Sequence, residues 1–368
     1  MILQFGTGNF LRAFVDLFVE QQDRESSHRI GPIVAIQSTG RERADLINAS
    51  GSLYHVAIQG VRNGETVDQT ERVTSLHEAL HAESRWMEIR SRALDPDLVA
   101  IVSNTTEAGL SLDPRDVRRS DSAPHSFPAK LLDLLLHRAE AGLPGPWILP
   151  CELVENNADR LLELVLDQAA LWSIDSDFVA DTLSNAQWTN TLVDRIVPGR
   201  PRNHPLLESD PLLVSAEPFA MWAVETEDET FPLTGHPSVI LADDISSYTL
   251  RKVRILNGAH SALVARSAGT GVKTVRECVE HPEIGPWLEG LLTEEIVPVL
   301  EGRCEDPAKF ARETLDRFRN PFLEHELSAI ALHHETKLEV RLRPTLNEFC
   351  ERFGKHPPRL TEILPGID

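Results

Sequence analysis

The chain has 368 residues and a formal net charge of −21 at pH 7, with 36 Lys and Arg against 57 Asp and Glu. Apolar residues make up 41% and charged residues 25%, the proportions of an ordinary globular protein of two or three domains. The charge disfavours nucleic acid and anionic membranes as partners, because phosphate is bound through clustered Lys and Arg, but it permits a small acidic substrate in a local basic pocket.

Predicted strands and helices alternate over the first 150 residues. Buried strands are predicted at 2–5, 32–37, 98–103 and 147–150, and more exposed ones at 54–58 and 71–73. Helical periodicity marks residues 9–18, 76–91 and 128–139. This alternation predicts an α/β domain with a parallel sheet.

The pattern changes near residue 245. A last strand is predicted at 238–241, and every later segment is predicted to be helical, including 249–267, 273–280, 284–299 and 308–317. We therefore predict a Rossmann-type sheet domain at residues 1–245 and a mainly α-helical domain at residues 246–368.

The four cysteines are far apart and form no CxxC, which is typical of reduced thiols in a cytoplasmic protein. The opening MILQFG shows no basic stretch followed by an apolar one, so we expect no signal peptide. No apolar run approaches the length of a membrane span. These features predict a cytoplasmic location.

Gly6-Thr7-Gly8 follows the first strand and opens the first helix, the setting of a dinucleotide-binding turn. The first glycine permits a tight turn, and the second lets the backbone approach a pyrophosphate at the helix N-terminus. Leu11 stands where the third glycine or alanine of this motif would be, so a structural turn without a ligand is the alternative.

The second strand is followed by Gln37-Ser38-Thr39-Gly40-Arg41. An NAD-specific site usually offers Asp or Glu to the adenosine ribose at this place. Ser38 and Arg41 can accommodate the 2′-phosphate of NADP, or they are solvated loop residues. The choice between NAD and NADP stays open.

Polar residues follow two further predicted strands. Asn104, Thr105 and Glu107 come after the strand at 98–103, at the sheet edge where open α/β folds bind ligands. Asn190 lies five residues before Arg195. Arg195 can also form a structural ion pair with the adjacent Asp194.

The segment RKVRILNGAH, residues 251–260, places Lys252, Asn257 and His260 among apolar residues of a predicted helix. At about 100° per residue the three side chains fall within roughly 140° of a helical wheel. Unpaired buried polar groups cost roughly 1–3 kcal/mol each. The stripe therefore indicates either a satisfied internal network or a catalytic site.

Two acidic or histidine-rich clusters do not indicate a metal. His333-His334-Glu335 lacks the HExxH spacing, and adjacent histidines point to different faces of a helix. Asp243-Asp244, at a strand end, is more typical of a helix cap. We expect no metal site.

Several segments together resemble the polyol-specific long-chain dehydrogenase/reductase family, which includes the mannitol dehydrogenases, over residues 2 to about 345. They are QFGTGNFLRAFVD (4–16), SNTTEAG (103–109), PAKL (128–131), PCELVENN (150–157), TLVDRIVPG (191–199), RKVRILNGAHSALV (251–264) and RFRNPFLEH (317–325). GNFLRAFVD, SNTTEAG and the CEL form of PCE are most similar to the tagaturonate reductase branch.

The resemblance implies a metal-free, NAD(P)-dependent enzyme that reversibly reduces a keto-hexuronate, L-tagaturonate to D-altronate. Alternatives within the family act on mannitol, mannitol 1-phosphate or fructuronate. The alternative outside enzymes is a non-catalytic dinucleotide-binding redox sensor. The joint presence of Lys252, Asn257 and His260 argues against it, because binding NAD requires none of them. The expected partner is a sugar acid or polyol, without nucleic acid or membrane, and the expected state is a monomer or dimer.

The resemblance also implies roles for individual residues. Lys252 would be the general acid/base, and Asn257, with Asn190, would hydrogen-bond the carbonyl oxygen as it gains charge. His260 would orient the substrate, and Glu107 would lie near the nicotinamide and relay a proton. Cofactor contacts are expected from Phe5, Gly6, Gly8, Asn9, Phe10, Ser38, Asn104 and Thr105.

Substrate contacts are expected from Lys337, Arg341 and Arg195. Lys337 and Arg341 are one helical turn apart, so both cations can face a carboxylate distant from the keto carbon. A solvated helix face is the alternative for this pair.

Overall fold

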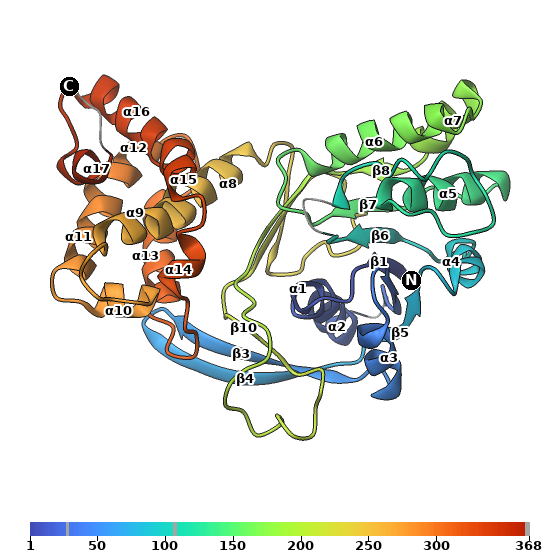
Figure 1. Cartoon of the computed structure of the whole chain (residues 1–368), viewed down its shortest axis with the longest axis horizontal. Coiled ribbons are helices and arrows are strands. Elements are labelled where there is room, and N and C mark those ends of the chain that lie inside the picture. The colour runs from blue at the N-terminus through green and yellow to red at the C-terminus, as the bar shows by residue number, and fades with distance from the viewer. Residues whose placement is uncertain (27–28, 106–108, 365–368) are drawn as a thin grey trace. The chain divides into compact units, whose positions relative to one another are not determined.

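The structure is a computed structural model of the chain, and it describes residues 1–26, 29–105 and 109–364 (Figure 1). The chain divides into two compact units. The first unit comprises Met1–Ala57, Thr70–Ala216 and Ala220–Ile245. The second unit comprises Ser246–Asp368 together with two earlier segments, Ile58–Gln69 and Glu217–Phe219.

The first unit is built on a six-stranded sheet with the order β5-β2-β1-β6-β7-β8, in which all recorded pairings are parallel. The strands are β1 (Ile2–Phe5), β2 (Ile33–Gln37), β5 (Leu76–His81), β6 (Ala100–Ser103), β7 (Trp147–Pro150) and β8 (Gln187–Trp188). β1 and β6 are buried along their whole length, as strands covered on both faces are. The predicted parallel sheet is confirmed, and its strand order reverses at β1.

The helices of this unit are α1 (Asn9–Arg12), α2 (Val15–Glu25), α3 (Glu42–Ala49), α4 (Trp86–Ala93), α5 (Phe127–Glu140), α6 (Asn157–Leu171) and α7 (Ser176–Ser184). α5 begins where Ser126 accepts a hydrogen bond from the Ala129 amide, and Pro128 stands in its first turn. Its leucines pack with α4, α6 and one face of the sheet in a single core, from Phe5 and Ile101 to Leu164. This core holds the first turn of α5 against the end of β1.

The helix predicted over residues 76–91 is wrong. The structure has β5 over Leu76–His81 and α4 over Trp86–Ala93. Leu76, Ala79 and Leu80 fit a helical stripe, but the same residues are the buried ones of a strand that pairs with β2. A short apolar run fits both the helical and the strand periodicity. Here the edge of β2, to which the run can pair, selects the strand.

The other strands form two smaller sheets. β10 (Val214–Ala216), β3 (Tyr54–Arg62) and β4 (Glu65–Val73) form one, and β12 (Val239–Ala242), β11 (Met221–Glu225) and β9 (Thr191–Asp194) form the other. β3 and β4 are longer than predicted, since Asn63 and Gly64, both at positive φ, make the turn of a continuous hairpin.

Helices dominate the second unit after Ser246, as predicted. They are α8 (Ser246–Arg251), a π-helical turn η2 (Lys252–Asn257), α9 (Gly258–Arg266), α10 (Val275–Glu280), α11 (Ile284–Gly290), η3 (Leu291–Ile296), α12 (Val297–Leu300), α13 (Pro307–Phe318), α14 (Leu327–Ile330), α15 (His334–Arg341), α16 (Arg343–Phe353) and α17 (Pro358–Ile363). α9 lies in the centre of their core, which includes Ile255, Leu263 and Leu292. Among the described residues, no helix has both the length and the apolar character to cross a membrane.

Candidate cofactor and catalytic sites

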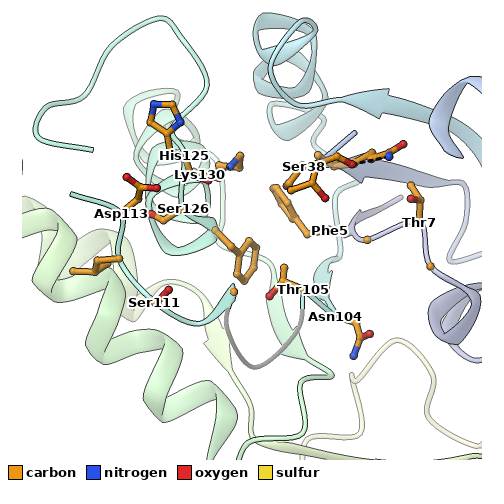
Figure 2. Close-up of a pocket in the computed structure, with 18 residues that line it drawn as sticks. Phe5, Thr7, Ser38, Asn104, Thr105, Ser111, Asp113, His125, Ser126 and Lys130 are labelled. Carbon is orange, nitrogen blue, oxygen red and sulfur yellow. Dashed lines mark hydrogen bonds between the residues drawn. The ribbon is translucent and has the colours of Figure 1, made fainter. Parts of the chain in front are cut away.

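A cavity of about 510 Å³ opens in the first unit beyond the carboxyl ends of β1, β2 and β6 (Figure 2). Ligands bind at this edge of open α/β sheets, at the place where the strand order reverses. The lining consists of Phe5, Gly6, Thr7, Gly8, Ile36, Gln37, Ser38, Thr39, Asn104, Thr105, Gly109, Ser111, Leu112, Asp113, His125, Ser126, Phe127 and Lys130.

Glycine is explained differently at the two positions of the first turn. Gly6 has a φ of +135°, and a Cβ there would meet Leu11 Cδ1 at 2.8 Å. Gly8 has an ordinary φ of −70°, and no protein atom lies within 4 Å of the place its Cβ would take. The protein itself therefore does not require glycine at position 8, whereas a phosphate that approaches the backbone there would.

The predicted cofactor residues fall into two groups. Six line the cavity, namely Phe5, Gly6, Gly8, Ser38, Asn104 and Thr105. Asn9 and Phe10 belong to α1 and are not among the residues recorded in the lining. The Asn9 side chain accepts a hydrogen bond from Arg12 at 2.6 Å, and the Phe10 ring stacks on Phe14. Their contact with a cofactor stays a prediction.

Glu152 fixes the chain that follows β6. Its carboxylate accepts hydrogen bonds from the Thr105 amide at 2.9 Å, from the Thr105 hydroxyl at 3.0 Å and from Ser103 at 3.0 Å. Asn104 donates to the Cys151 carbonyl at 2.7 Å. Burial raises the pKa of Glu152, and the hydrogen bonds from Thr105 and Ser103 oppose the rise. The PCE segment thus holds Asn104 and Thr105 at the cavity.

Sequence reasoning missed the opposite wall of the cavity, which consists of residues between Ser111 and Lys130. Asp116 accepts hydrogen bonds from the backbone of His125 and Ser126 and from the Ser126 hydroxyl, at 2.7 to 2.8 Å. Ser126 in turn caps α5. The PAKL segment, at the start of α5, was the only sign of this wall in the sequence, because the loop before it has no periodicity.

The catalytic residues predicted for the second unit lie on one continuous helical run, α8–η2–α9 (Figure 1). Lys252 begins and Asn257 ends the π-helical turn, and both are half-buried. Hydrogen bonds in a π turn join residues five apart, which brings these two side chains closer to one face than α-helical spacing does. Such turns occur frequently at functional sites.

His260 lies one turn further along and is 8% exposed. Its ring packs on Phe318 and His325, with centroids 4.4 and 4.8 Å away. Burial lowers the pKa of His260 well below its usual range, and His325, Arg317 and Arg341 lower it further. The ring forms a hydrogen bond with the Leu256 backbone, while its Nε2 has no partner within the described part of the chain. His260 is therefore neutral, with Nε2 as an acceptor.

Arg341 and Lys337 both lie on α15 and are half-buried. Arg341 Nη1 donates to the Ser261 hydroxyl at 3.1 Å and to the Asn257 carbonyl at 3.4 Å. Lys337 Nζ donates to the Ile330 carbonyl at 2.8 Å. The structure thus brings Arg341 to the helix that carries Asn257 and His260, and substrate binding by the pair stays a prediction.

Three predicted residues remain, namely Asn190, Arg195 and Glu107, and their roles stay predictions. Asn190, 8% exposed, accepts from the Ala158 and Asp159 amides at the start of α6, and its own amide donates to Asp159. Arg195, also 8% exposed, donates to the Ala13 carbonyl at 2.8 Å. Glu107 lies outside the described residues. Across the described ranges, no group of three or more His, Cys, Asp or Glu is arranged to hold a metal ion.

Comparisons with known proteins cover both units. A family model for the mannitol dehydrogenase Rossmann domain matches residues 1–233, and one for the mannitol dehydrogenase C-terminal domain matches residues 244–366. The altronate oxidoreductase of Bacillus subtilis (strain 168) is 36% identical over 98% of this chain and 77% of its own length. The altronate oxidoreductase of Yersinia enterocolitica is 37% identical over 100% of this chain and 78% of its own length.

Solved structures show the same fold. A D-sorbitol dehydrogenase in substrate-free form matches with a TM-score of 0.82 at 22% identity, over 95% of this chain and 76% of its own. The Pseudomonas fluorescens mannitol 2-dehydrogenase, in a ternary complex with NAD and D-mannitol, matches with a TM-score of 0.78 at 20% identity, over 98% and 76% of the two chains.

Proposed function

The chain belongs to the mannitol dehydrogenase family of oxidoreductases, and we propose that it catalyses the reversible, NAD(P)-dependent reduction of a keto-hexuronate, L-tagaturonate to D-altronate. The observation that carries the proposal is the identity of 36–37% to altronate oxidoreductases along the whole chain. Lys252, Asn257 and His260 lie on one continuous helical run, which supports a catalytic rather than a sensing role.

The first unit supports a dinucleotide cofactor. Gly6 makes the tight turn, and the open space beside Gly8 admits a pyrophosphate to the backbone. A cavity of about 510 Å³ falls within the range of small-molecule sites, and Ser38 and Asn104 line it from the ends of two different strands. When bound, NAD(P)H supplies the hydride that reduces the keto carbon.

The second unit supplies the proton and the orientation. Lys252 gives a proton to the oxygen of the keto group during reduction and takes it back during oxidation of the alcohol. The Asn257 amide donates to the same oxygen as negative charge develops on it. The His260 ring, one turn further along the same helical run, orients the sugar.

The substrate is tested by following NADH absorbance with tagaturonate, fructuronate, fructose and fructose 6-phosphate. We expect kcat/KM for tagaturonate to exceed that for the other ketoses by at least about tenfold, the effect of about 1.4 kcal/mol in transition-state binding. A preference for fructuronate, fructose or fructose 6-phosphate would assign the chain to another activity of the family. Binding of NADH without turnover of any of the four would support a redox sensor instead.

The acid/base is tested with Lys252→Ala. We expect kcat to fall by at least about 10²-fold, the lower end of what a positioned acid or base contributes, while NADH binding stays near wild type. Lys355→Ala, which removes an exposed lysine of the same unit, serves as the matched control. A kcat within a few-fold of wild type, or loss of the folded state, would place Lys252 in a structural network.

A further inference from the structure

Two charged residues of the cofactor cavity have no part in the roles described so far. Lys130 and Asp113 both line the cavity, on the wall that runs from Ser111 to Lys130 (Figure 2). Ser38 and Thr7 lie across the cavity from this wall. Lys130 is 3% exposed, so its amine has been taken almost completely out of bulk water.

The fold of the wall holds both groups in place. Lys130 stands in the first turn of α5, and its Nζ donates to the His125 carbonyl at 2.6 Å. A lysine ammonium has three donors, and this bond uses one of them. Asp113 forms a two-point ion pair with Arg115, whose Nε and Nη2 donate to the two carboxylate oxygens at 2.8 and 2.6 Å.

The charges of the pair are settled by their surroundings. Arg115 lowers the pKa of Asp113 below its usual range, so this carboxylate remains an acceptor at any working pH. Burial lowers the pKa of Lys130 to about 8, and Asp116 and Asp113 oppose that fall. Charged or neutral, the amine still donates hydrogen bonds.

Apolar side chains provide a place for a flat ring beside the pair. Ile36, Leu112 and Phe127 line the same cavity, and Phe127 packs on Phe5 with ring centroids 4.9 Å apart. A slot with apolar walls and a few placed polar groups at its edge is the usual form of a site for an aromatic ligand. Adenine needs such a slot, with an acceptor for its N6 amino group and a donor for N1 or N7.

We propose that Asp113 and Lys130 read the edge of the adenine base, with the Asp113 carboxylate accepting from the N6 amino group and the Lys130 amine donating to the neighbouring ring nitrogen. This inference rests on the proposed use of NAD(H). It explains why a lysine is buried at the cavity, since a bond to the His125 carbonyl alone could be made by an amide or hydroxyl at far lower cost of desolvation. Hypoxanthine carries an oxygen in place of N6, and this oxygen would face the carboxylate.

The test compares NADH with reduced nicotinamide hypoxanthine dinucleotide in calorimetric titrations of the full chain. We expect wild type to bind NADH at least about tenfold more tightly than the hypoxanthine analogue, the effect of about 1.4 kcal/mol. Lys130→Met should weaken NADH binding about tenfold. Asp113→Asn, whose amide can donate to the hypoxanthine oxygen, should bring the two dissociation constants within about threefold of each other.

Controls separate recognition from folding. Lys355→Met makes the same exchange at an exposed position and should leave both dissociation constants unchanged. If Lys130→Met fails to fold, Asp113→Asn still tests the proposal, because Asp113 is only half-buried. Equal binding of the two dinucleotides by wild type, or an Asp113→Asn variant that keeps the wild-type ratio, would overturn it.

The outcomes also distinguish this inference from the proposed reaction. If no sugar in the panel is reduced but the binding pattern holds, adenine recognition stands and the proposed substrate falls. If tagaturonate is reduced but wild type does not discriminate between the dinucleotides, the reaction stands and the adenine site falls. A wild type that binds neither dinucleotide contradicts both.

Discussion

Arg341 connects a predicted substrate contact to the helix that carries the predicted catalytic residues. Its Nη1 reaches Ser261 Oγ and the Asn257 carbonyl, and burial lowers its pKa from its ordinary value. A guanidinium remains charged in proteins and has five donors in a planar fork. The fork can therefore hold α9 and still present donors to the carboxylate of a uronate.

Arg341→Ala should raise KM for both sugars, and the fold-increase for tagaturonate should be at least about ten times that for uncharged fructose. The reason is that only the uronate loses a charge-assisted bond. The measurement is steady-state kinetics with both sugars. Arg343→Ala is a suitable control, since Arg343 pairs with Glu339 on the same α15–α16 segment. Equal effects on the two sugars would show that Arg341 acts only by holding α9.

Asp16 is a fully buried carboxyl group in the first unit. The Tyr54 hydroxyl donates to the Arg12 carbonyl at 2.7 Å and lies 3.0 Å from Asp16 Oδ2. The hydroxyl has one proton, so a protonated Asp16 that donates to the tyrosine oxygen satisfies both contacts. Burial raises the pKa of Asp16 to about 7, while the charge of Arg12 opposes the rise.

This shift predicts how stability depends on pH. An unfolded aspartate has a pKa of about 3.9, so between about pH 4 and pH 7 the folded state binds more protons at Asp16 than the unfolded state. The free energy of unfolding should fall as pH rises through that window, by up to about 4 kcal/mol relative to Asp16→Asn, which lacks the ionisation. Urea unfolding of both proteins from pH 4 to 7.5 measures this, and parallel curves would contradict it.

At the scale of elements, we expect the loop after β2 to set the choice between NAD and NADP. The Gln37 side chain is used within the loop, where it donates to the Thr39 carbonyl and accepts from the Ala44 amide, each at 2.7 Å. Ser38 is exposed and lines the cavity. Of the two, Ser38 is therefore the residue that can meet the adenosine ribose.

Ser38→Asp should suppress use of NADPH by at least about tenfold and change use of NADH little, because a carboxylate accepts from the 2′-hydroxyl but repels a 2′-phosphate. Rates with the two coenzymes give the ratio directly. Ser184→Asp adds the same charge at the exposed end of α7 and should leave the ratio unchanged. A wild type that already rejects NADPH strongly would mean that Ser38 is not at the ribose.

At the scale of the whole molecule, the second unit is assembled from segments that lie far apart in the sequence. Arg317 on α13 and Glu217 are each 2% exposed as side chains and form hydrogen bonds at 2.9 and 2.8 Å. The Asn320 side chain donates to the Gln59 carbonyl at 3.0 Å. Phe219 packs on Arg317 as well.

A fragment of residues 246–368 should therefore lack the cooperative thermal transition of the full chain. It loses the two segments that pack on Arg317 and Asn320, and with them part of the ~5–15 kcal/mol that stabilises a domain. Circular dichroism melting compares the fragment with the full chain, and Glu217→Gln in the full chain should lower the melting temperature. A fragment that melts sharply near the same temperature would refute this.

The sequence alone was sufficient for the architecture and for the family. Mainly apolar runs such as 2–5 and 98–103 predict buried parallel strands, because a strand covered on both faces has few polar side chains. The Gly6-Thr7-Gly8 turn and the Lys252 to His260 spacing predict the cofactor and catalytic regions, because those chemistries require particular residues at short separations along the chain. Local pattern carries this information without any knowledge of distant contacts.

Only the tertiary structure decided what depends on residues far apart in the chain. Residues 76–81 became a strand because β2 offers them a pairing edge. Asp113 lines the same cavity as Lys130 of α5 because Asp116 ties the loop to His125 and Ser126, directly before that helix. The π-helical form of Lys252–Asn257 and the neutral state of His260 likewise arise in a packed environment. Burial and long-range hydrogen bonds set these features, and a linear pattern of residues does not encode which distant groups will meet.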